Sequence, residues 1–143
     1  MRSMRYEHSL LISAPASVVW DLTVDIERWP DFTPTMQHIE LLDPAPLGVG
    51  GRARIKQPMQ PKAIWTVTEF EPGSRLVWET RHRGLTLAGA HLVEDVDGDT
   101  CRNTLSVEAT GRAAGPFTLL FGATLRRFIA RENEGFRAAA VQR

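Results

Sequence analysis

The sequence predicts an α+β fold in which a seven-stranded antiparallel sheet wraps around one long C-terminal helix, with two short helices after the first strand. Three observations predict this fold. Strand-like segments follow one another with only short turns of Gly, Pro and Asp between them, which is typical of antiparallel hairpins. A helical apolar pattern then runs from residue 117 to about residue 140. Finally, a proline opens a short helical segment directly after the first strand.

The elements can be assigned in chain order. Apolar and polar residues alternate over the first strand, at residues 5–13, and Pro15 is tolerated in the first turn of the next helix because its missing N–H has no partner there. Two short helices fill residues 15–29, and Pro30 is expected to stop the second one. Turn residues separate the remaining six strands, which we expect at residues 35–42, 51–57, 63–71, 75–82, 84–96 and 100–110.

The long C-terminal helix carries an apolar stripe on one side. At helical spacing the stripe contains Phe117, Phe121, Leu125, Phe128 and Phe136, and the opposite side contains Arg126, Arg127, Asn133 and Arg137. We expect the stripe to face the sheet, where it would contribute to the core and line any cavity. Gly135 lies near the stripe and would either let another segment approach closely or loosen the helix end.

Length and composition indicate a single domain that spans residues 1–143, with a core large enough to need no disulfides. The 17 basic and 17 acidic residues balance, which argues against a nucleic-acid binder because no basic excess is present to neutralise phosphates. Cys101 is the lone cysteine and the N-terminus has no apolar signal segment, so the expected compartment is the reducing cytoplasm. The longest apolar stretch, residues 113–125, is too short for stable membrane insertion.

His91 is the first candidate for chemistry. It lies on the more apolar face of the strand at residues 84–96, together with Leu85, Leu87, Gly89 and Val93. This face is expected to point inwards. A histidine inside an apolar cavity could act as a general acid or base near neutral pH. The alternative is a core or rim histidine whose nitrogens are satisfied by backbone groups or water.

Glu132 is the second candidate, because helical spacing places its carboxyl within the apolar stripe, one turn from Phe128. Burial at that position would raise the pKa of the carboxyl and suit proton transfer. Glu132 could pair with His91, or with Arg131 or Arg81 at the mouth of a cavity. The alternative is that this part of the helix extends beyond the sheet and exposes Glu132 to water.

Four tryptophans are many for this length, and indole rings suit the wall of a ligand pocket because they offer broad apolar faces and one N–H donor. Trp20 and Trp29 belong to the two short helices, and Trp65 and Trp78 belong to adjacent strands. Each could equally be part of the core, with Trp20 and Trp78 the more core-like. Met59, at the tip of the loop at residues 56–62, is either a flap that adapts to ligands or part of a plain surface loop.

Motifs for other chemistries are missing from the sequence. The GVGG stretch at residues 48–51 lacks the Lys-Ser/Thr of a phosphate-binding loop, and there is no GxSxG motif. The four histidines lack metal-ligand spacing and Cys101 has no CxxC partner, so we expect neither a metal nor another cofactor. Cys101 itself is expected to be a small buried residue.

A resemblance to a known family rests on three segments: YEHSLLISAPASVVWDLTVDIERWPDF at residues 6–32, WTVTEFEPGSRLVWE at 65–79 and HLVEDVDGDTCRNTLSVE at 91–108. In this order they resemble the START/Bet v 1-like (SRPBCC) superfamily, and within it the polyketide cyclase/dehydrase and lipid-transport group. The resemblance covers essentially the whole chain. It implies a helix-grip fold with an apolar cavity between sheet and C-terminal helix, and it places Trp29, Phe32 and Met36 at the cavity entrance.

The resemblance leaves three functions open. The first is binding of a small hydrophobic or aromatic molecule, lipid-like or polyketide-like, in the central cavity. The second is a polyketide cyclase/dehydrase-type enzyme in which His91 or Glu132 would transfer protons. The third is a protein-interaction module. Monomer and homodimer both stay open, because an uncovered edge strand could pair across a dimer.

The candidate ligand contacts come from the short helices, the loop at residues 56–62, the inner faces of the strands and the apolar stripe. They are Trp20, Trp29, Phe32, Met36, Met59, Trp65, Trp78, Leu85, Leu87, His91, Phe117, Phe121, Leu125 and Phe128. His91 and Glu132 are the candidate catalytic residues.

Overall fold

The computed structural model describes residues 4–44, 46–57 and 61–142. Within these residues the strands are β1 (Met4–Ile12), β2 (His38–Leu41), β3 (Arg52–Lys56), β4 (Ala63–Glu71), β5 (Arg75–His82), β6 (Leu85–Asp95) and β7 (Cys101–Thr110). The helices are α1 (Ala16–Val24), the 3-10 helix η1 (Ile26–Asp31) and α2 (Ala114–Val141). None of these helices combines the length and the apolar character that crossing a bilayer requires.

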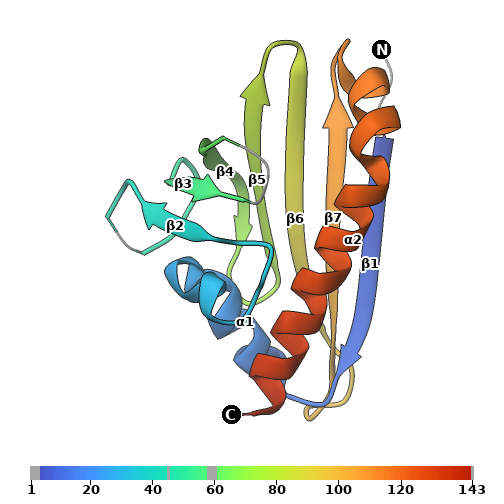
Figure 1. The fold of residues 1–143 in the computed structure, drawn as a ribbon. Coiled ribbons are helices and arrows are strands. Elements are labelled where there is room, and N and C mark those ends of the chain that lie inside the picture. Colours follow the sequence, from blue (N-terminus) through green and yellow to red (C-terminus); the bar gives the residue numbers. More distant parts are fainter. Residues whose placement is uncertain (1–3, 45, 58–60, 143) are drawn as a thin grey trace.

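The seven strands of the described chain form one antiparallel sheet in the order β1-β7-β6-β5-β4-β3-β2. Strands β2 to β7 pair with their neighbours in the sequence, whereas β1 pairs with β7, from Met4 opposite Ala109 to Ile12 opposite Cys101. The sheet curves around α2, which packs mainly on β1 and β7, while η1 packs on β2 (Figure 1). The predicted α+β helix-grip fold is therefore confirmed.

Several element boundaries differ from the prediction. Strand β2 begins at His38 rather than at Thr35, because Thr35 and Met36 are buried in the turn after η1, where the Met36 N–H donates to the Thr33 carbonyl over 3.2 Å. The 3-10 helix runs through Pro30 to Asp31, since proline keeps a helical φ and gives up only one N–H donor. Helix α2 begins at Ala114, three residues before the predicted start, with Pro116 in its first turn.

The N-terminal half of α2 buries a different face from the predicted stripe. Phe121 is 47% exposed and Phe117 is half-buried, whereas Thr118 and Gly122 are buried. A Cβ atom on Gly122 would lie 2.5 Å from the Tyr6 hydroxyl oxygen, so this half of the helix sits closer to β1 than a larger residue would allow. The close approach turns Thr118 and Gly122 towards the sheet. The prediction that Phe117 and Phe121 face the core is therefore wrong.

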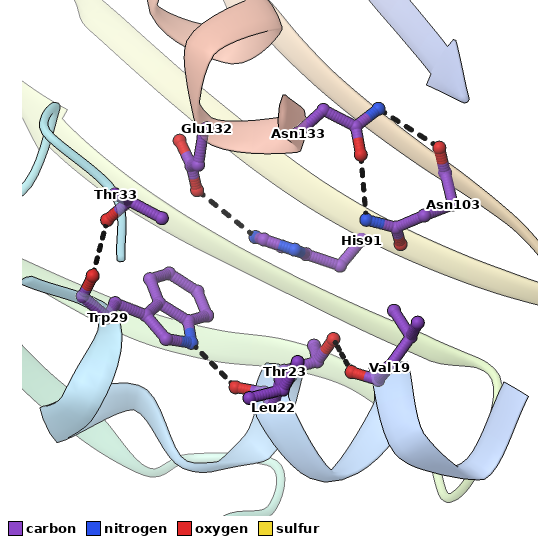
Figure 2. Close-up of polar contacts among 9 residues, drawn as sticks. All are labelled: Val19, Leu22, Thr23, Trp29, Thr33, His91, Asn103, Glu132 and Asn133. Atoms are coloured by element: carbon purple, nitrogen blue, oxygen red, sulfur yellow. Dashed lines mark hydrogen bonds and ion pairs between the residues drawn. The ribbon is translucent and has the colours of Figure 1, made fainter. Parts of the chain in front are cut away.

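Asn133 is also misplaced by the prediction, which put it on the polar outer side of the helix. It is fully buried, and its Nδ2 donates to the backbone carbonyls of His8 (3.1 Å) and Asn103 (3.0 Å). The Asn103 Nδ2 donates in return to the Asn133 Oδ1 over 2.9 Å (Figure 2). Because buried amides need such partners, these bonds set the rotation of α2 about its axis. That rotation fixes the direction of the preceding residue, Glu132.

Candidate functional site

A cavity of about 70 Å³ lies between α2 and the face of the sheet that packs on it. Its wall comes from η1 and the turn after it, from β3 and the residue after it, from β4 to β7 and from the middle of α2: Trp29, Met36, Ile55, Gln57, Trp65, Trp78, Leu87, Gly89, Ala90, His91, Leu105, Ser106, Val107, Leu125, Phe128, Ile129 and Glu132. Most of these residues are apolar. Within this described wall, His91 and Glu132 are the titratable side chains, and neither lysine nor arginine is present.

His91 on β6 and Glu132 on α2 face each other inside the cavity. The His91 Nε2 lies 3.8 Å from the Glu132 Oε1, and the two side chains are only 5% and 9% exposed (Figure 2). This separation is longer than a hydrogen bond, so a ligand oxygen could hydrogen-bond to both groups. The other ring nitrogen of His91, Nδ1, is buried and has no hydrogen-bond partner in the part of the chain that the structure describes. The pair therefore has unused hydrogen-bonding capacity within the buried site.

Burial shifts the pKa values of both groups towards their neutral forms. Desolvation lowers the pKa of His91 from 6.5 to about 3 and raises the pKa of Glu132 from 4.5 to about 8. At pH 7 the contact is therefore a neutral imidazole facing a neutral carboxylic acid, and not an ion pair. The pKa of the Glu132 carboxyl therefore lies close enough to neutral pH for proton transfer, whereas the lowered pKa of His91 makes it a hydrogen-bonding group and only a weak base.

Trp29 forms the part of the wall that lies against His91. Its ring centroid is 4.9 Å from that of His91 and 5.6 Å from that of Phe136. The indole Nε1 donates to the Leu22 carbonyl over 3.0 Å, and the Thr33 hydroxyl donates to the Trp29 carbonyl over 2.7 Å (Figure 2). Held at both the ring and the backbone, Trp29 is a fixed wall that keeps bulk water away from His91.

Two further tryptophans cover the sheet side of the cavity. Trp65 and Trp78 lie with ring centroids 5.9 Å apart, against Gly89 of β6. A Cβ atom on Gly89 would lie 3.3 Å from the Trp78 Nε1 and 3.7 Å from the Trp65 ring. The absence of a side chain at Gly89 therefore lets both indole rings approach the strand closely, and it gives the cavity an aromatic floor.

The structure gathers about half of the predicted ligand contacts in one place. The cavity wall includes Trp29, Met36, Trp65, Trp78, Leu87, His91, Leu125 and Phe128, together with the candidate acid Glu132. These residues come from η1 and the turn after it, three strands and α2, so they meet only in the folded chain. Met59 lies outside the described residues.

The other candidates lie away from the cavity: Trp20, Phe32, Leu85, Phe117 and Phe121. Trp20 is a core residue whose ring packs 5.6 Å from that of Phe70, and Phe32 packs 5.1 Å from Phe136. Along β6 the cavity wall reaches only as far as Leu87. Leu85, two residues nearer the β5–β6 turn, lines a separate hollow on the surface. Phe117 and Phe121 pack on each other with centroids 5.2 Å apart.

Several residues of the wall were not among the candidates. Leu105 and Val107 lie opposite His91 and Gly89 in the register of β6 and β7, so they occupy the same face of the sheet. Alternation along β7 could have identified them once its pairing with β6 was known. Ile129 could not be identified in this way, because its position depends on the rotation of α2 that Asn133 sets.

Metal-binding and thiol chemistry receive no support from the described residues. No group of three or more His, Cys, Asp or Glu side chains among them could hold a metal ion. Cys101 is free and buried, and burial raises the pKa of its thiol. A buried thiol of this kind is a poor nucleophile.

Comparison with known sequences identifies the family. A family model described as "Polyketide cyclase / dehydrase and lipid transport" matches residues 3–141. The chain belongs to this family. The resemblance to the START/Bet v 1-like superfamily is thereby confirmed. Among curated protein sequences no significant match is found.

Solved structures of other proteins share the helix-grip fold of this family member. An aromatase/cyclase from Streptomyces sp. R1128 is 19% identical, with 99% of this chain and 93% of that chain covered and a TM-score of 0.70. Norcoclaurine synthase from Thalictrum flavum is 13% identical, with 99% and 96% covered and a TM-score of 0.78. A START superfamily protein from Mycobacterium smegmatis is 13% identical, with 94% and 97% covered and a TM-score of 0.74. At these identities the likeness establishes the fold, and the chemistry depends on this chain's own residues.

Proposed function

We propose that this family member binds a small hydrophobic or aromatic molecule that carries one uncharged polar group. The observation that carries the proposal is a largely apolar wall, rich in aromatic rings, around one titratable pair, His91 and Glu132. Burial of the ligand's apolar surface would contribute roughly 25 cal/mol per Å², and the pair would orient the polar group. Because the described wall holds no lysine or arginine, a hydroxyl or carbonyl suits it better than a carboxylate does.

The cavity must enlarge to take such a ligand. Its volume of about 70 Å³ is less than half of the roughly 150 Å³ of an apolar protein cavity that binds benzene. Leu87, Leu125 and Phe128 are half-buried wall residues, so they can rotate away at lower cost than the fully buried Trp29. Ligand binding is therefore expected to move these three side chains and to leave the fixed side of the wall in place.

Replacing His91 by phenylalanine is expected to reduce the preference for a polar ligand group. The wild type should bind 2-naphthol about tenfold more tightly than naphthalene, because a hydrogen bond in a buried site contributes roughly 1 kcal/mol or more. The His91→Phe variant keeps an aromatic ring in the wall but leaves only Glu132 of the pair to bond the hydroxyl, so it should bind the two compounds with more similar affinities. Isothermal titration calorimetry at pH 7 measures both dissociation constants.

Phe121→Ala is the matched control, because Phe121 lies on α2 but outside the cavity wall. This variant should bind both compounds as the wild type does. Failure of the wild type to bind either compound would remove the cavity as a ligand site. A tenfold preference that persists in His91→Phe would show that another group orients the ligand.

A second candidate function, proton-transfer catalysis of the cyclase/dehydrase type, is favoured by the polar pair itself. Ring closure and loss of water in a polyketide-like chain require one group that removes a proton from carbon and another that protonates an oxygen. Protonated Glu132 could donate a proton to the oxygen, while His91, a weak base at its lowered pKa, would hydrogen-bond to the substrate. Above its raised pKa, Glu132 would itself become a desolvated and therefore effective base.

The probe 5-nitrobenzisoxazole tests for such a base, because its ring opens when a single proton is removed. The wild-type rate should rise with pH through about 8 as Glu132 ionises, and Glu132→Gln should lower the rate above that pH by about 100-fold. The absorbance of the phenolate product reports the rate. Glu134→Gln removes an exposed carboxyl two residues away and should leave the rate unchanged. If Glu132→Gln opened the ring at the wild-type rate, Glu132 would not be a catalytic base, and ligand binding would stand as the proposed function.

A further inference from the structure

The exposed half of α2 presents large apolar side chains to water. Leu119 is 87% exposed, Leu120 is 74% exposed and Phe121 is 47% exposed. Met4 at the start of β1 is also exposed and shares a surface hollow with Leu119. We call these four residues the apolar tip. Because folded monomers seldom expose several large apolar side chains within one helical turn, this cluster is a candidate interaction surface.

Basic side chains border the apolar tip. Two surface hollows, one beside Leu119 and one beside the β5–β6 turn, share Gly111 and Arg112. The second hollow is also lined by Arg81, His82 and Arg83, and no aspartate or glutamate is among the described lining residues of either hollow. We call Arg81, Arg83 and Arg112 the basic rim. Of its members, Arg81 also lies 3.3 Å from Glu79.

The tip and the rim lie at the same end of the molecule. Figure 1 shows the β5–β6 turn, the connection from β7 to α2 and the first turns of α2 together at this end. The Ala113 N–H donates to the Gly84 carbonyl over 3.1 Å, which ties the turn to the start of the helix. Arg83 and Arg112 therefore bring positive charge to this end, while the charge of Arg81 is partly offset by Glu79.

We propose that the apolar tip and the basic rim form a docking surface for an anionic lipid bilayer. The exposed side chains of Leu119 and Leu120 would insert between lipid headgroups, while the arginines would contact lipid phosphates. Exposed leucine and phenylalanine beside arginine is the combination that binds a membrane interface without spanning it. The charge of the rim selects an anionic surface over a neutral one.

Docking in this orientation would present the cavity's apolar stripe to the membrane. Phe121 of the tip lies one helical turn from Leu125, and Leu125 and Phe128 line the cavity. A ligand could then pass along this stripe between the membrane and the cavity. That step rests on the proposed function, whereas docking to the membrane does not. One end of this apolar stripe would then contact the membrane surface, and the other end would contact the ligand.

Vesicle co-sedimentation tests the docking surface. The wild type should bind vesicles of phosphatidylcholine with 30% phosphatidylglycerol at about 0.1 M salt and bind pure phosphatidylcholine vesicles far more weakly. Leu119→Ser/Leu120→Ser should weaken binding by about tenfold or more. Arg83→Gln/Arg112→Gln should weaken it by roughly 25-fold, at about fivefold for each arginine, and only on the anionic vesicles.

Two controls match these variants in exposure. Val96→Ser removes an exposed apolar side chain from the β6–β7 turn and Arg28→Gln removes an exposed arginine from η1, and both should bind as the wild type does. The proposal is overturned if the wild type does not bind anionic vesicles or if the controls weaken binding equally. It is also overturned if sedimentation velocity shows a dimer that Leu119→Ser/Leu120→Ser converts to a monomer, because the tip would then face a second copy. Naphthol binding by the same variants should be unchanged, so failure here is distinct from failure of the ligand site.

Discussion

Replacing Gly135 by alanine is expected to lower the free energy of unfolding by about 3 kcal/mol, the upper part of the range for overpacked sites. A Cβ atom at this position would lie 2.2 Å from the Phe32 carbonyl oxygen and 3.3 Å from the Thr33 methyl carbon. The obstacle is backbone, which cannot rotate away as a side chain can. The end of η1 would have to separate from α2. Urea unfolding followed by circular dichroism measures the loss.

The same change should also weaken ligand binding, because the Phe32 and Thr33 N–H groups donate to the Trp29 carbonyl over 3.1 and 2.8 Å. Displacing this segment would move Trp29, the fixed wall against His91. Gly115→Ala, on the same helix, is the control: a Cβ atom there meets nothing within 4 Å. It should leave stability unchanged or raise it by up to about 1 kcal/mol, since alanine favours the helix more than glycine does. Equal losses in the two variants would contradict the close approach at Gly135.

Replacing Glu132 by glutamine is expected to change the pH dependence of stability. For Glu132, the folded pKa of about 8 exceeds the ordinary 4.5, so its contribution to stability is complete below pH 4.5 and is lost as the pH rises to 8. For His91, the folded pKa of about 3 lies below 6.5, so its contribution is complete above pH 6.5 and is lost as the pH falls to 3.

These two dependences oppose each other in the wild type. Between pH 4.5 and 6.5 the folded pair holds one proton, on Glu132, and the unfolded pair also holds one, on His91. Their joint contribution is therefore flat across this window. Without Glu132 the histidine acts alone, so the stability of Glu132→Gln should rise with pH up to about 6.5. Between pH 4.5 and 8, the free energy of unfolding of the variant should rise relative to that of the wild type by at most about 1.4 kcal/mol per pH unit.

Urea unfolding between pH 4 and 8.5 measures both curves. Glu134→Gln is the control, because it removes an exposed carboxyl that pairs with Arg137 on the same helix. Its curve should parallel that of the wild type. A Glu132→Gln curve that also stays parallel to the wild type would mean that the Glu132 carboxyl is ionised at pH 7, as in an ordinary surface position.

The fold could be predicted because its signals are local. The predicted ranges for β4 and β5 agree with the structure residue for residue, since a Pro-Gly turn separates two runs of strand-forming residues. The predicted position of His91 on the inner face followed from the period of two along β6. Glu132 was identified because a carboxyl interrupts an otherwise apolar helical stripe. Each of these signals lies within a few neighbouring residues.

The rotation of α2 could not be predicted, because long-range partners decide it. The helix has two adjacent faces that could be buried, one rich in phenylalanine and one with the small residues Thr118 and Gly122. Hydrophobicity favours the first face. The structure buries the second in the N-terminal half, because Gly122 fits against Tyr6 of β1 and Asn133 finds its partners on β1 and β7. The meeting of Glu132 with His91 depends on this choice, so sequence patterns alone named both residues without fixing their contact.

The pairing of β1 with β7 also determines when the sheet can be completed during synthesis of the chain. Ile12 pairs with Cys101, so the first strand emerges from a ribosome roughly 5 to 20 s before its partner at ordinary translation rates. Until then its backbone N–H and C=O groups have no partner strand, which makes the nascent chain vulnerable to mispairing. Helix α2 is made last, and it carries Glu132 to His91 and closes the cavity. An unfinished chain therefore has neither the contact between His91 and Glu132 nor the cavity around it.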